Sequence, residues 1–429
     1  MKIHFVGIGG IGMSALARLY HESGHQISGS DFEDSELLNL LRKEGIRIQI
    51  GHASNQVPKN ANCVIYSEAI LNNNVELKKA RQLKIPLKTY FAALGEFTAN
   101  KKTICIAGTH GKTTTTALVA KILIDAKLDP SIVIGTQMQE LDNKNMRSGK
   151  GEYMVVEACE YRRSFHYLKP QLIILTNIEL DHVDYYKNIA DYLSAFKEFI
   201  QKLPPTGFLI ANYDDLNIRK IIKTTPVKVI RYSQKSSELI KIKLKVPGQH
   251  NLMNALAAFT LGKSLNLDEK IILKSLNNFT GTWRRFEYLG KFNKALIYTD
   301  YAHHPTEIQA TLKAAREKYP KYRIIVVFQP HQYSRARYFL KQFSESFSLA
   351  DEVIIPNIYK VRDSIEDSQA VTPEKMVKEI QKHHKKVKYG KGLGSTTAYL
   401  KQKITKNDLV LIMGAGDVWE ITGELVSKK

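Results

Sequence analysis

Residues 108–114 read Gly-Thr-His-Gly-Lys-Thr-Thr and follow a short apolar run at residues 104–107. Backbone N–H groups in such a glycine turn can point toward an anion, and the start of a following helix adds the positive end of its dipole. Lys112 is suited to reach the outer phosphates of a nucleotide, and the Thr113 hydroxyl is suited to bind Mg²⁺. We therefore predict a strand, a phosphate loop and a helix. The alternative is a turn that only caps a helix, because two residues rather than four separate the glycines.

A second glycine turn follows the apolar residues 3–6. Residues 7–12 have the spacing G-x-G-x-x-G, and a second expected strand at residues 26–30 ends at Asp31. In a Rossmann-type unit, such a turn faces a pyrophosphate and such an acid accepts a hydrogen bond from a ribose hydroxyl. The pattern predicts a nucleotide-type ligand, and a uridine diphosphate offers the same groups as a dinucleotide.

Polar side chains end two expected strands beyond the phosphate loop, at residues 153–160 and 172–182. Because the carboxyl ends of parallel strands meet at one edge of a sheet, we expect these side chains to gather near the loop. Mg²⁺ prefers oxygen ligands, so Glu157 and Thr113 are predicted to share one ion, and His182 is a less usual ligand for a second. A helix-capping carboxylate and a structural histidine are the alternatives.

Amide and guanidinium groups follow in the next segment. Residues 246–258 predict a turn and a helix, with Asn251 and Asn254 on one face. Their amides suit the edge of adenine, although Asn251 could instead cap the helix. Arg284 and Arg285 lie near an expected domain boundary, where their planar groups match phosphate oxygens and a solvated surface is the alternative.

The remaining third of the chain repeats the alternation of strands and helices. Expected strands again run into loops that carry His, Arg, Asp or Gly, and they begin at residues 295, 323, 351 and 408. Polar groups at strand ends in three α/β regions suggest ligands held between domains. We expect domains at residues 1–99, 100–288 and 289–429, with residues 98–102 as the first linker.

Composition limits the class of protein. The 429 residues are 43% hydrophobic and 24% charged, as in globular proteins, and no apolar run is long enough to span a membrane. Three widely spaced cysteines argue against a disulfide framework, and the first residues lead directly into an expected strand. We therefore expect a cytoplasmic protein without a signal peptide.

The formal net charge of +21 permits nucleic-acid binding, which is the alternative to an enzyme. The lysines are scattered along the chain, and the densest basic run, at residues 382–386, is short. A lysine-rich surface or attraction of small anions explains the charge better. We expect no nucleic-acid partner.

These motifs together resemble the Mur ligase family across nearly the whole chain. The shortened phosphate loop is typical of that family, as is the opening Gly-Ile-Gly-Gly-Ile-Gly-Met-Ser. Further motifs follow in family order: Glu157-Ala-Cys-Glu-Tyr, Thr176-Asn-Ile-x-x-Asp-His, His250-Asn-x-x-Asn-Ala, Arg284-Arg-Phe-Glu, Asp300-Tyr-Ala-His-His-Pro and Gln329-Pro-His.

The resemblance implies an α/β protein of three domains: a Rossmann-like domain, a central ATPase-like domain with a parallel sheet, and a second Rossmann-like domain. It implies ATP- and Mg²⁺-dependent synthesis of an amide in peptidoglycan precursors, through an acyl phosphate. The implied substrates are UDP-N-acetylmuramate and L-alanine. Members that attach a tripeptide to the same sugar nucleotide are the alternative, and folylpolyglutamate-type ligases are more distant because they lack the opening unit.

The resemblance also implies residue roles. The UDP moiety would contact Gly9, Gly10, Gly12, Asp31 and Ser67. ATP would contact Gly108, Thr109, His110, Gly111, Lys112, Thr113, Thr114, Asn251, Asn254, Arg285 and Asp300. The remaining substrate contacts would come from Asn177, His303, His331, Arg335 and Arg337. Catalysis would rest on Lys112, Glu157, His182 and Arg285, with metal ligands Thr113, Glu157 and His182.

Four positions depart from the family pattern or leave it open. Thr299 and Ala302 stand where many members have Asp and Gly, and Gln332 stands where many have Arg. These changes remove an acidic ligand and a basic contact. Lys197 lies near the position of a carbamylated lysine in several relatives, but a lysine on a solvated helix face is the preferred interpretation.

Overall fold

The computed structural model describes residues 1–361 and 363–426. It confirms an α/β fold with three predominantly parallel sheets. The described chain forms two compact units. Unit 1 contains Met1–Ile178, Leu193–Glu238 and Ala255–Leu276, and unit 2 contains Glu179–Tyr192, Leu239–Asn254 and Asn277–Lys429.

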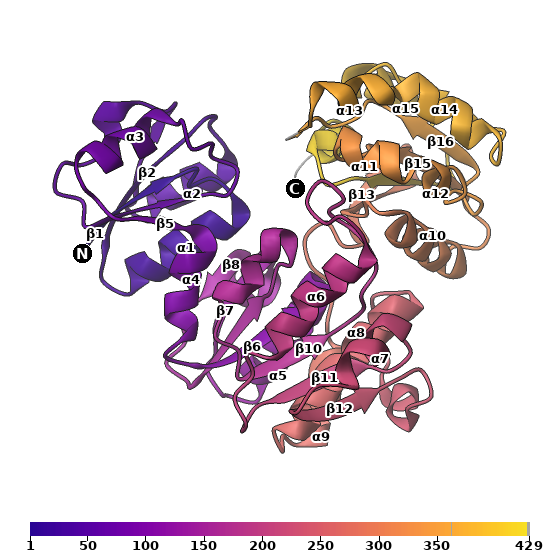
Figure 1. The fold of residues 1–429 in the computed structure, drawn as a ribbon. Coiled ribbons are helices and arrows are strands. Elements are labelled where there is room, and N and C mark those ends of the chain that lie inside the picture. Colours follow the sequence, from indigo (N-terminus) through magenta and orange to yellow (C-terminus); the bar gives the residue numbers. More distant parts are fainter. Residues whose placement is uncertain (362, 427–429) are drawn as a thin grey trace. The chain divides into compact units, whose positions relative to one another are not determined.

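The first sheet of unit 1 has the strand order β3-β2-β1-β4-β5, and all of its pairs are parallel (Figure 1). The strands are β1 (Lys2–Val6), β2 (Gln26–Asp31), β3 (Arg47–Ile50), β4 (Cys63–Tyr66) and β5 (Leu87–Thr89). The helices are α1 (Ile11–Glu22), α2 (Glu36–Lys43), α3 (Val75–Gln82) and α4 (Tyr90–Thr98). The order reverses between β1 and β4, which is where open α/β sheets hold their ligands.

The second sheet of unit 1 has the order β12-β11-β10-β6-β9-β7-β8. Its strands are β6 (Lys102–Ala107), β7 (Ser131–Met138), β8 (Lys144–Arg147), β9 (Tyr153–Glu157), β10 (Leu172–Leu175), β11 (Phe208–Asn212) and β12 (Lys228–Tyr232). Only the edge pair β7–β8 is antiparallel among the described strands of this sheet. The helices in this part of the chain are α5 (Lys112–Asp125), α6 (Ile189–Ile200), α7 (Leu216–Ile222), α8 (Gln249–Ser264) and α9 (Glu269–Asn277).

The bounds of three predicted elements need correction. The expected linker at residues 98–102 is shorter, because α4 includes Thr98 and β6 begins at Lys102. Thr98 is buried, and its hydroxyl donates to the carbonyl of Gly95 inside the helix. The expected strand at residues 172–182 ends at Leu175, because the next side chains bond to the phosphate loop instead of continuing the sheet. Likewise, β9 ends at Glu157 rather than at residue 160.

Unit 2 contains a six-stranded sheet of order β13-β14-β18-β15-β16-β17, antiparallel only at β13–β14 among its described pairs (Figure 1). Its strands are β13 (Glu287–Phe292), β14 (Ala295–Asp300), β15 (Arg323–Phe328), β16 (Glu352–Ile355), β17 (Val387–Tyr389) and β18 (Asp408–Met413). Its helices are α10 (Pro305–Lys318), α11 (Tyr333–Tyr338), α12 (Leu340–Ser344), α13 (Ile365–Ala370), α14 (Pro373–Gln381), α15 (Leu393–Lys403) and α16 (Ile421–Leu425).

Alternation along β15 explains the layers of unit 2. Val326 and Phe328 enter a core that also contains Phe343 and Met376, whereas Ile325 and Val327 enter a second core on the other face. Successive side chains of a strand point to opposite faces, so a strand covered on both sides is apolar at every position. The continuous apolar runs in the sequence therefore correspond to central strands.

The proposed limits of three domains at residues 99 and 288 stay a prediction.

Among residues 1–361 and 363–426, every helix is too short or too polar to cross a membrane.

Candidate active site

The phosphate loop connects β6 to α5 as the sequence predicts. Gly108 has φ +138° and Gly111, which precedes the helix, has φ +80°. A Cβ at Gly108 would lie 2.0 Å from the hydroxyl oxygen of Thr176. Both glycines are thus required, the first by close packing as well as by its backbone conformation.

The two residues that follow β10 form hydrogen bonds with this loop. The Asn177 side chain accepts from His110 N at 2.8 Å and donates to His110 O at 2.9 Å. The Thr176 hydroxyl donates to the same carbonyl at 2.7 Å. These bonds hold the short loop in one conformation. The observed bonds give Asn177 a role in supporting the loop, and its predicted contact with substrate stays a prediction.

Lys112 lies at the start of α5 and turns back into the loop. Its ammonium donates to Gly108 O at 2.6 Å, to Thr109 O at 3.0 Å and to Glu160 Oε1 at 3.1 Å. Burial alone would lower the pKa of Lys112, but the Glu160 carboxylate raises it above its usual value. The lysine is therefore held charged where an anion would enter. Sequence reasoning assigned Glu160 no role, although its position in the Glu-x-x-Glu motif was visible.

The Thr113 hydroxyl and the Glu157 carboxylate form a candidate Mg²⁺ site. Thr113 Oγ lies 3.0 Å from Glu157 Oε2, and Gly135 N donates to Glu157 Oε1 at 2.7 Å. Two neighbouring ligands of an octahedral Mg²⁺, each about 2.1 Å from the ion, are about 3.0 Å apart. The residues therefore fit such an ion. His182 belongs to unit 2, and its metal role stays a prediction.

The first glycine turn combines three predicted groups. Gly9 N donates to Asp31 Oδ2 at 2.6 Å, and Ser67, which follows β4, lies so close to Gly7 that a Cβ there would be 3.1 Å from the serine Cβ. Asp31 and Ser67 are thus beside the turn, at the reversal of strand order. A Cβ at Gly12 would lie 2.9 Å from the Tyr90 ring, so sequence reasoning missed a neighbour of this turn.

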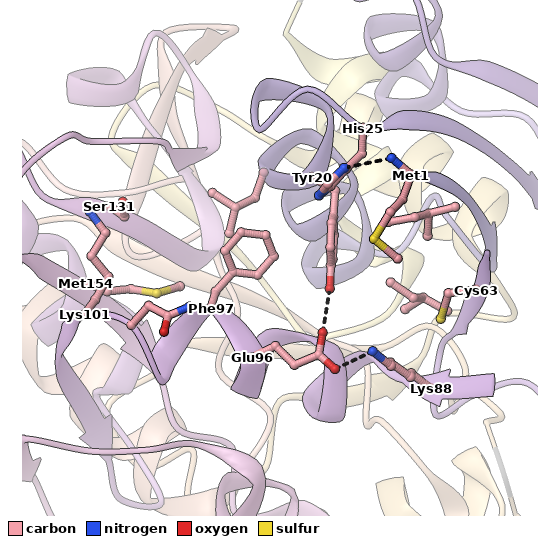
Figure 2. Close-up of a pocket in the computed structure, with 14 residues that line it drawn as sticks. Met1, Tyr20, His25, Cys63, Lys88, Glu96, Phe97, Lys101, Ser131 and Met154 are labelled. Carbon is pink, nitrogen blue, oxygen red and sulfur yellow. Dashed lines mark hydrogen bonds and ion pairs between the residues drawn. The ribbon is translucent and has the colours of Figure 1, made fainter. Parts of the chain in front are cut away.

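A cavity of about 290 Å³ in unit 1 is separate from these loops (Figure 2). It lies beside α1, α4 and the starts of β1 and β9, and Tyr20 and Phe97 line it. Lys88 pairs with Glu96 at its wall. None of its lining residues is a predicted site residue. The loops at the strand ends, rather than this cavity, carry the chemistry predicted from the sequence.

In unit 2, a buried ion pair joins residues far apart in sequence. Arg335 Nε donates to Asp181 Oδ1 at 3.0 Å and Arg335 Nη2 donates to Asp181 Oδ2 at 3.3 Å. The side chains are 4% and 6% exposed. Burial alone would raise the pKa of Asp181, but Arg335 lowers it well below its usual range. The predicted substrate contact Arg335 thus already holds a carboxylate, and Asp181 was not predicted as its partner.

Two predicted histidines lie beside this ion pair. His331 Nδ1 is 3.3 Å from Arg335 Nη1, and the rings of His331 and His303 are 6.1 Å apart. His303 Nδ1 is 3.0 Å from Tyr301 O and 3.3 Å from Glu307 Oε2. Burial lowers the pKa of His303 to about 4. It is therefore neutral near pH 7.

The two neighbouring arginines have different surroundings. Arg284 is buried and donates to the carbonyls of Gly414 and Gly416, which is a structural role. The guanidinium of Arg285 lies over the Tyr301 ring at 4.8 Å, and its phosphate contact stays a prediction. Both guanidinium groups contact other residues, so the alternative of two arginines that are simply solvated at the surface does not hold.

Asp300 ends β14 as predicted and is buried. It accepts from Phe286 N and Ala302 N, each at 2.7 Å. Burial raises its pKa to about 6. The backbone bonds orient the carboxylate, and its contact with ATP stays a prediction.

Asn251 and Asn254 are both buried on α8. Asn251 Nδ2 donates to Pro247 O at 2.7 Å, which fixes the turn before the helix. Asn251 lies inside the helix, which begins at Gln249, so it is not the capping residue. A role at adenine stays a prediction for both.

Arg337 is separated from the cluster around Arg335. Its side chain is 48% exposed and pairs with Glu366 and Asp367. Residues two apart on a helix do not share a face, so α11 cannot present both arginines to one ligand. The structure therefore does not place Arg337 with the other predicted substrate contacts.

Gln332, Thr299 and Ala302, which depart from the family pattern, are all buried. Gln332 has φ +73°, is buried, and precedes α11; its amide lies 3.5 Å from Val361 O. Thr299 and Ala302 are buried beside Asp300. Lys197 is exposed on α6, in agreement with the solvated-helix interpretation.

Family models match three consecutive segments of the chain. The models described as "Mur ligase family, catalytic domain", "Mur ligase middle domain" and "Mur ligase, glutamate ligase domain" match residues 2–102, 106–240 and 284–416. These segments contain the first glycine turn, the phosphate loop, and the histidine–arginine cluster of His303, His331 and Arg335, respectively.

Curated relatives match the whole chain. The UDP-N-acetylmuramate–L-alanine ligase of Alkaliphilus metalliredigens is 40% identical and covers 100% of this chain and 97% of its own. That of Clostridium tetani is 38% identical, with 100% and 98% covered.

Solved structures agree with this relationship. The UDP-N-acetylmuramate–alanine ligase of Thermotoga maritima has a TM-score of 0.85 at 28% identity and covers 99% of this chain and 98% of its own. A murein peptide ligase of Psychrobacter arcticus shares the fold, with a TM-score of 0.75 at 22% identity and 99% and 98% covered. The chain belongs to the Mur ligase family.

Proposed function

We propose that this protein joins L-alanine to the lactyl carboxylate of UDP-N-acetylmuramate, with ATP converted to ADP and phosphate. The observation that carries the proposal is the full-length relationship, at 40% identity, to a ligase named for these substrates. The phosphate loop and the first glycine turn support it, because they offer sites for a triphosphate and for a nucleotide sugar. We place the reaction in the cytoplasm, where peptidoglycan precursors would be made.

In the first step, a carboxylate oxygen attacks the γ-phosphorus of ATP, the bond to the β-phosphate bridging oxygen breaks, and ADP leaves. Both reactants are anions, so the barrier includes their repulsion. The charged, partly buried Lys112 would contact the β- and γ-phosphates. The backbone N–H groups at the start of α5 would add donors that need no reorganisation.

Thr113 and Glu157 would hold Mg²⁺ at the edge of this loop. When bound, the ion would neutralise charge on the phosphate oxygens. Gly135 N fixes one oxygen of Glu157, which leaves the other directed at Thr113. Orientation by such a second bond strengthens a metal ligand.

In the second step, the neutral amine nitrogen of L-alanine attacks the acyl carbon and a C–N bond forms. The C–O bond to phosphate then breaks, and the departing phosphate takes the bonding electrons and the proton that the nitrogen loses. His303 is neutral near pH 7 because its pKa is about 4. It would accept a hydrogen bond from the amine but is too weak a base to hold its proton at that pH. The planar guanidinium of Arg335 suits a carboxylate, and in the structure it binds that of Asp181.

A phosphate-release assay tests the proposal. Purified protein with ATP, Mg²⁺ and UDP-N-acetylmuramate is supplied with a panel of amine acceptors. We expect phosphate release to require L-alanine. Faster release with L-Ala-γ-D-Glu-meso-diaminopimelate would instead support the tripeptide ligase. Absence of release with every acceptor, together with duplex DNA binding in moderate salt, would support the non-enzymatic alternative.

A further inference from the structure

The ammonium of Lys112 has three oxygen groups around it. Two are loop carbonyls, Gly108 O and Thr109 O, and the third is the Glu160 carboxylate. A lysine ammonium has three N–H donors, so these acceptors match its capacity. A phosphate oxygen must therefore displace one of them to contact Lys112.

Glu160 is the acceptor that most resembles a phosphate. Its Oε2 lies 2.9 Å from Lys112 Nζ, its side chain is 1% exposed, and that of Lys112 is 17% exposed. A carboxylate is anionic, as is a phosphate, whereas the two carbonyls are neutral parts of the loop itself. An ion pair in a dry site is stronger than one at the surface. Glu160 therefore makes with Lys112 the kind of contact that a phosphate oxygen would make.

The backbone after Glu160 is constrained in an unusual way. Arg162 and Arg163 have φ values of +52° and +57°, in the left-handed region that non-glycine residues seldom adopt. Arg163 N donates to Glu160 O at 2.8 Å, and its guanidinium bonds to Ser194 and Glu198. These contacts hold a strained turn, and the turn positions Glu160 under the loop.

We propose that Glu160 is an internal competitor of the triphosphate, which occupies Lys112 in the nucleotide-free protein and releases it when ATP binds. The proposal rests on the proposed function of the loop as an ATP site. The contact with Glu160 holds the Lys112 ammonium within the loop, at the expense of nucleotide affinity. Glu160 is thus a positioning residue that tunes ATP binding.

Calorimetric titration with ATP at pH 7 in EDTA tests this competition, because EDTA removes the contribution of a metal ion to phosphate binding. The isosteric variant Glu160→Gln should bind ATP about tenfold more tightly than the unchanged protein, since a full anionic partner is removed. Unchanged or weaker binding would overturn the proposal and would indicate that Glu160 serves to keep Lys112 charged.

A double-mutant cycle with Lys112→Met separates competition from general repulsion. With Lys112 absent there is nothing to release, so adding Glu160→Gln should change ATP affinity by no more than about twofold. The same tenfold gain in both backgrounds would mean that Glu160 only repels the phosphates, and would refute the competition. Glu157→Gln serves as the matched control, because its anion bonds to Thr113 rather than to Lys112 and should give a smaller gain in EDTA.

Two further measurements keep the outcomes distinct. Circular dichroism checks folding; if Glu160→Gln does not fold, Glu160→Asp, which shortens the side chain by one methylene, should give a smaller gain of the same sign. Alanine-dependent phosphate release by the unchanged protein is measured separately. Normal release without a gain in Glu160→Gln sinks only the competition, whereas a gain without any release sinks only the proposed ligase.

Discussion

The phosphate loop of unit 1 and the histidine–arginine cluster of unit 2 are built in opposite ways at the ends of parallel strands. The loop relies on backbone groups of a few consecutive residues, two left-handed glycines and one lysine. The cluster relies on a buried ion pair between Asp181 and Arg335, which are 154 positions apart. One site is local in sequence and the other is assembled by the fold.

This difference determines what each site tolerates. Substitution removes a backbone donor only where proline is introduced, so the loop is sensitive mainly at its glycines and at the side chains that contact phosphate. The cluster contains charges in a dry environment, so removal of one partner leaves the other uncompensated. We expect substitutions in the loop to reduce mainly the rate of catalysis, and substitutions in the cluster to reduce mainly the free energy of unfolding.

The largest effect is expected for Lys112→Ala. Turnover should fall by about 10²–10³-fold or more, because a charge that acts on the transferring phosphate is lost. Binding of UDP-N-acetylmuramate, measured by calorimetry, should change little, since the first glycine turn is untouched. Turnover close to normal would refute the role of the loop lysine.

Asp181→Asn tests the opposite character of the cluster. The substitution leaves Arg335 buried without its anion, and the free energy of unfolding should fall by about 3–5 kcal/mol. Guanidinium denaturation measures the change. Arg337→Ala is the control, because Arg337 lies on the same helix as Arg335. Its exposed pairs with Glu366 and Asp367 should contribute almost nothing to the free energy of unfolding. Equal effects of the two variants would show that the buried pair is no more important than a surface pair.

The pH dependence of stability sharpens the comparison, because two groups of unit 2 titrate in opposite senses. The folded pKa of His303 is lowered to about 4, so its contribution is present above pH 6.5 and is lost as the pH falls toward 4. The folded pKa of Asp300 is raised to about 6, so its contribution is present below pH 4 and is lost as the pH rises toward 6. The two slopes oppose each other in the unchanged protein.

Single variants should separate these slopes. Relative to the unchanged protein, His303→Gln should lose stability as the pH rises from 4 to 6.5, and Asp300→Asn should gain it, each by about 2–3 kcal/mol at most. Thermal unfolding at several pH values measures both differences. Parallel slopes for the two variants would contradict the assigned protonation states. The phosphate loop should contribute little here, because the Glu160 carboxylate raises the pKa of Lys112 above its usual value despite burial, so the lysine stays charged throughout this range.

The smallest effect is expected for Lys197→Ala. Lys197 is exposed on α6, so the phosphate-release rate should stay within about twofold. A large loss that bicarbonate modulates in the unchanged protein would instead indicate a carbamylated lysine. The substitution thus tests whether α6 contributes to the phosphate loop or to the histidine–arginine cluster.

The strand and the helix that flank the phosphate loop were the most predictable parts of the molecule. The apolar run before Gly108 and the helix after Gly111 are local signals, and the structure has both elements where expected. Boundaries failed where polar side chains bond to the backbone inside elements, as Thr98 does in α4, or where a chain leaves the sheet after Leu175. Local composition does not distinguish these cases.

By itself, the sequence determined the α/β alternation, the two glycine turns and the family relationship, because each depends on residue types at short fixed spacings. Only the tertiary structure decided which carboxylate meets which cation. Glu160 bonds to Lys112 and Asp181 bonds to Arg335, whereas Arg337 lies at the surface although it is only two residues from Arg335. Such pairings depend on burial and on helix faces, and these are properties of the folded chain.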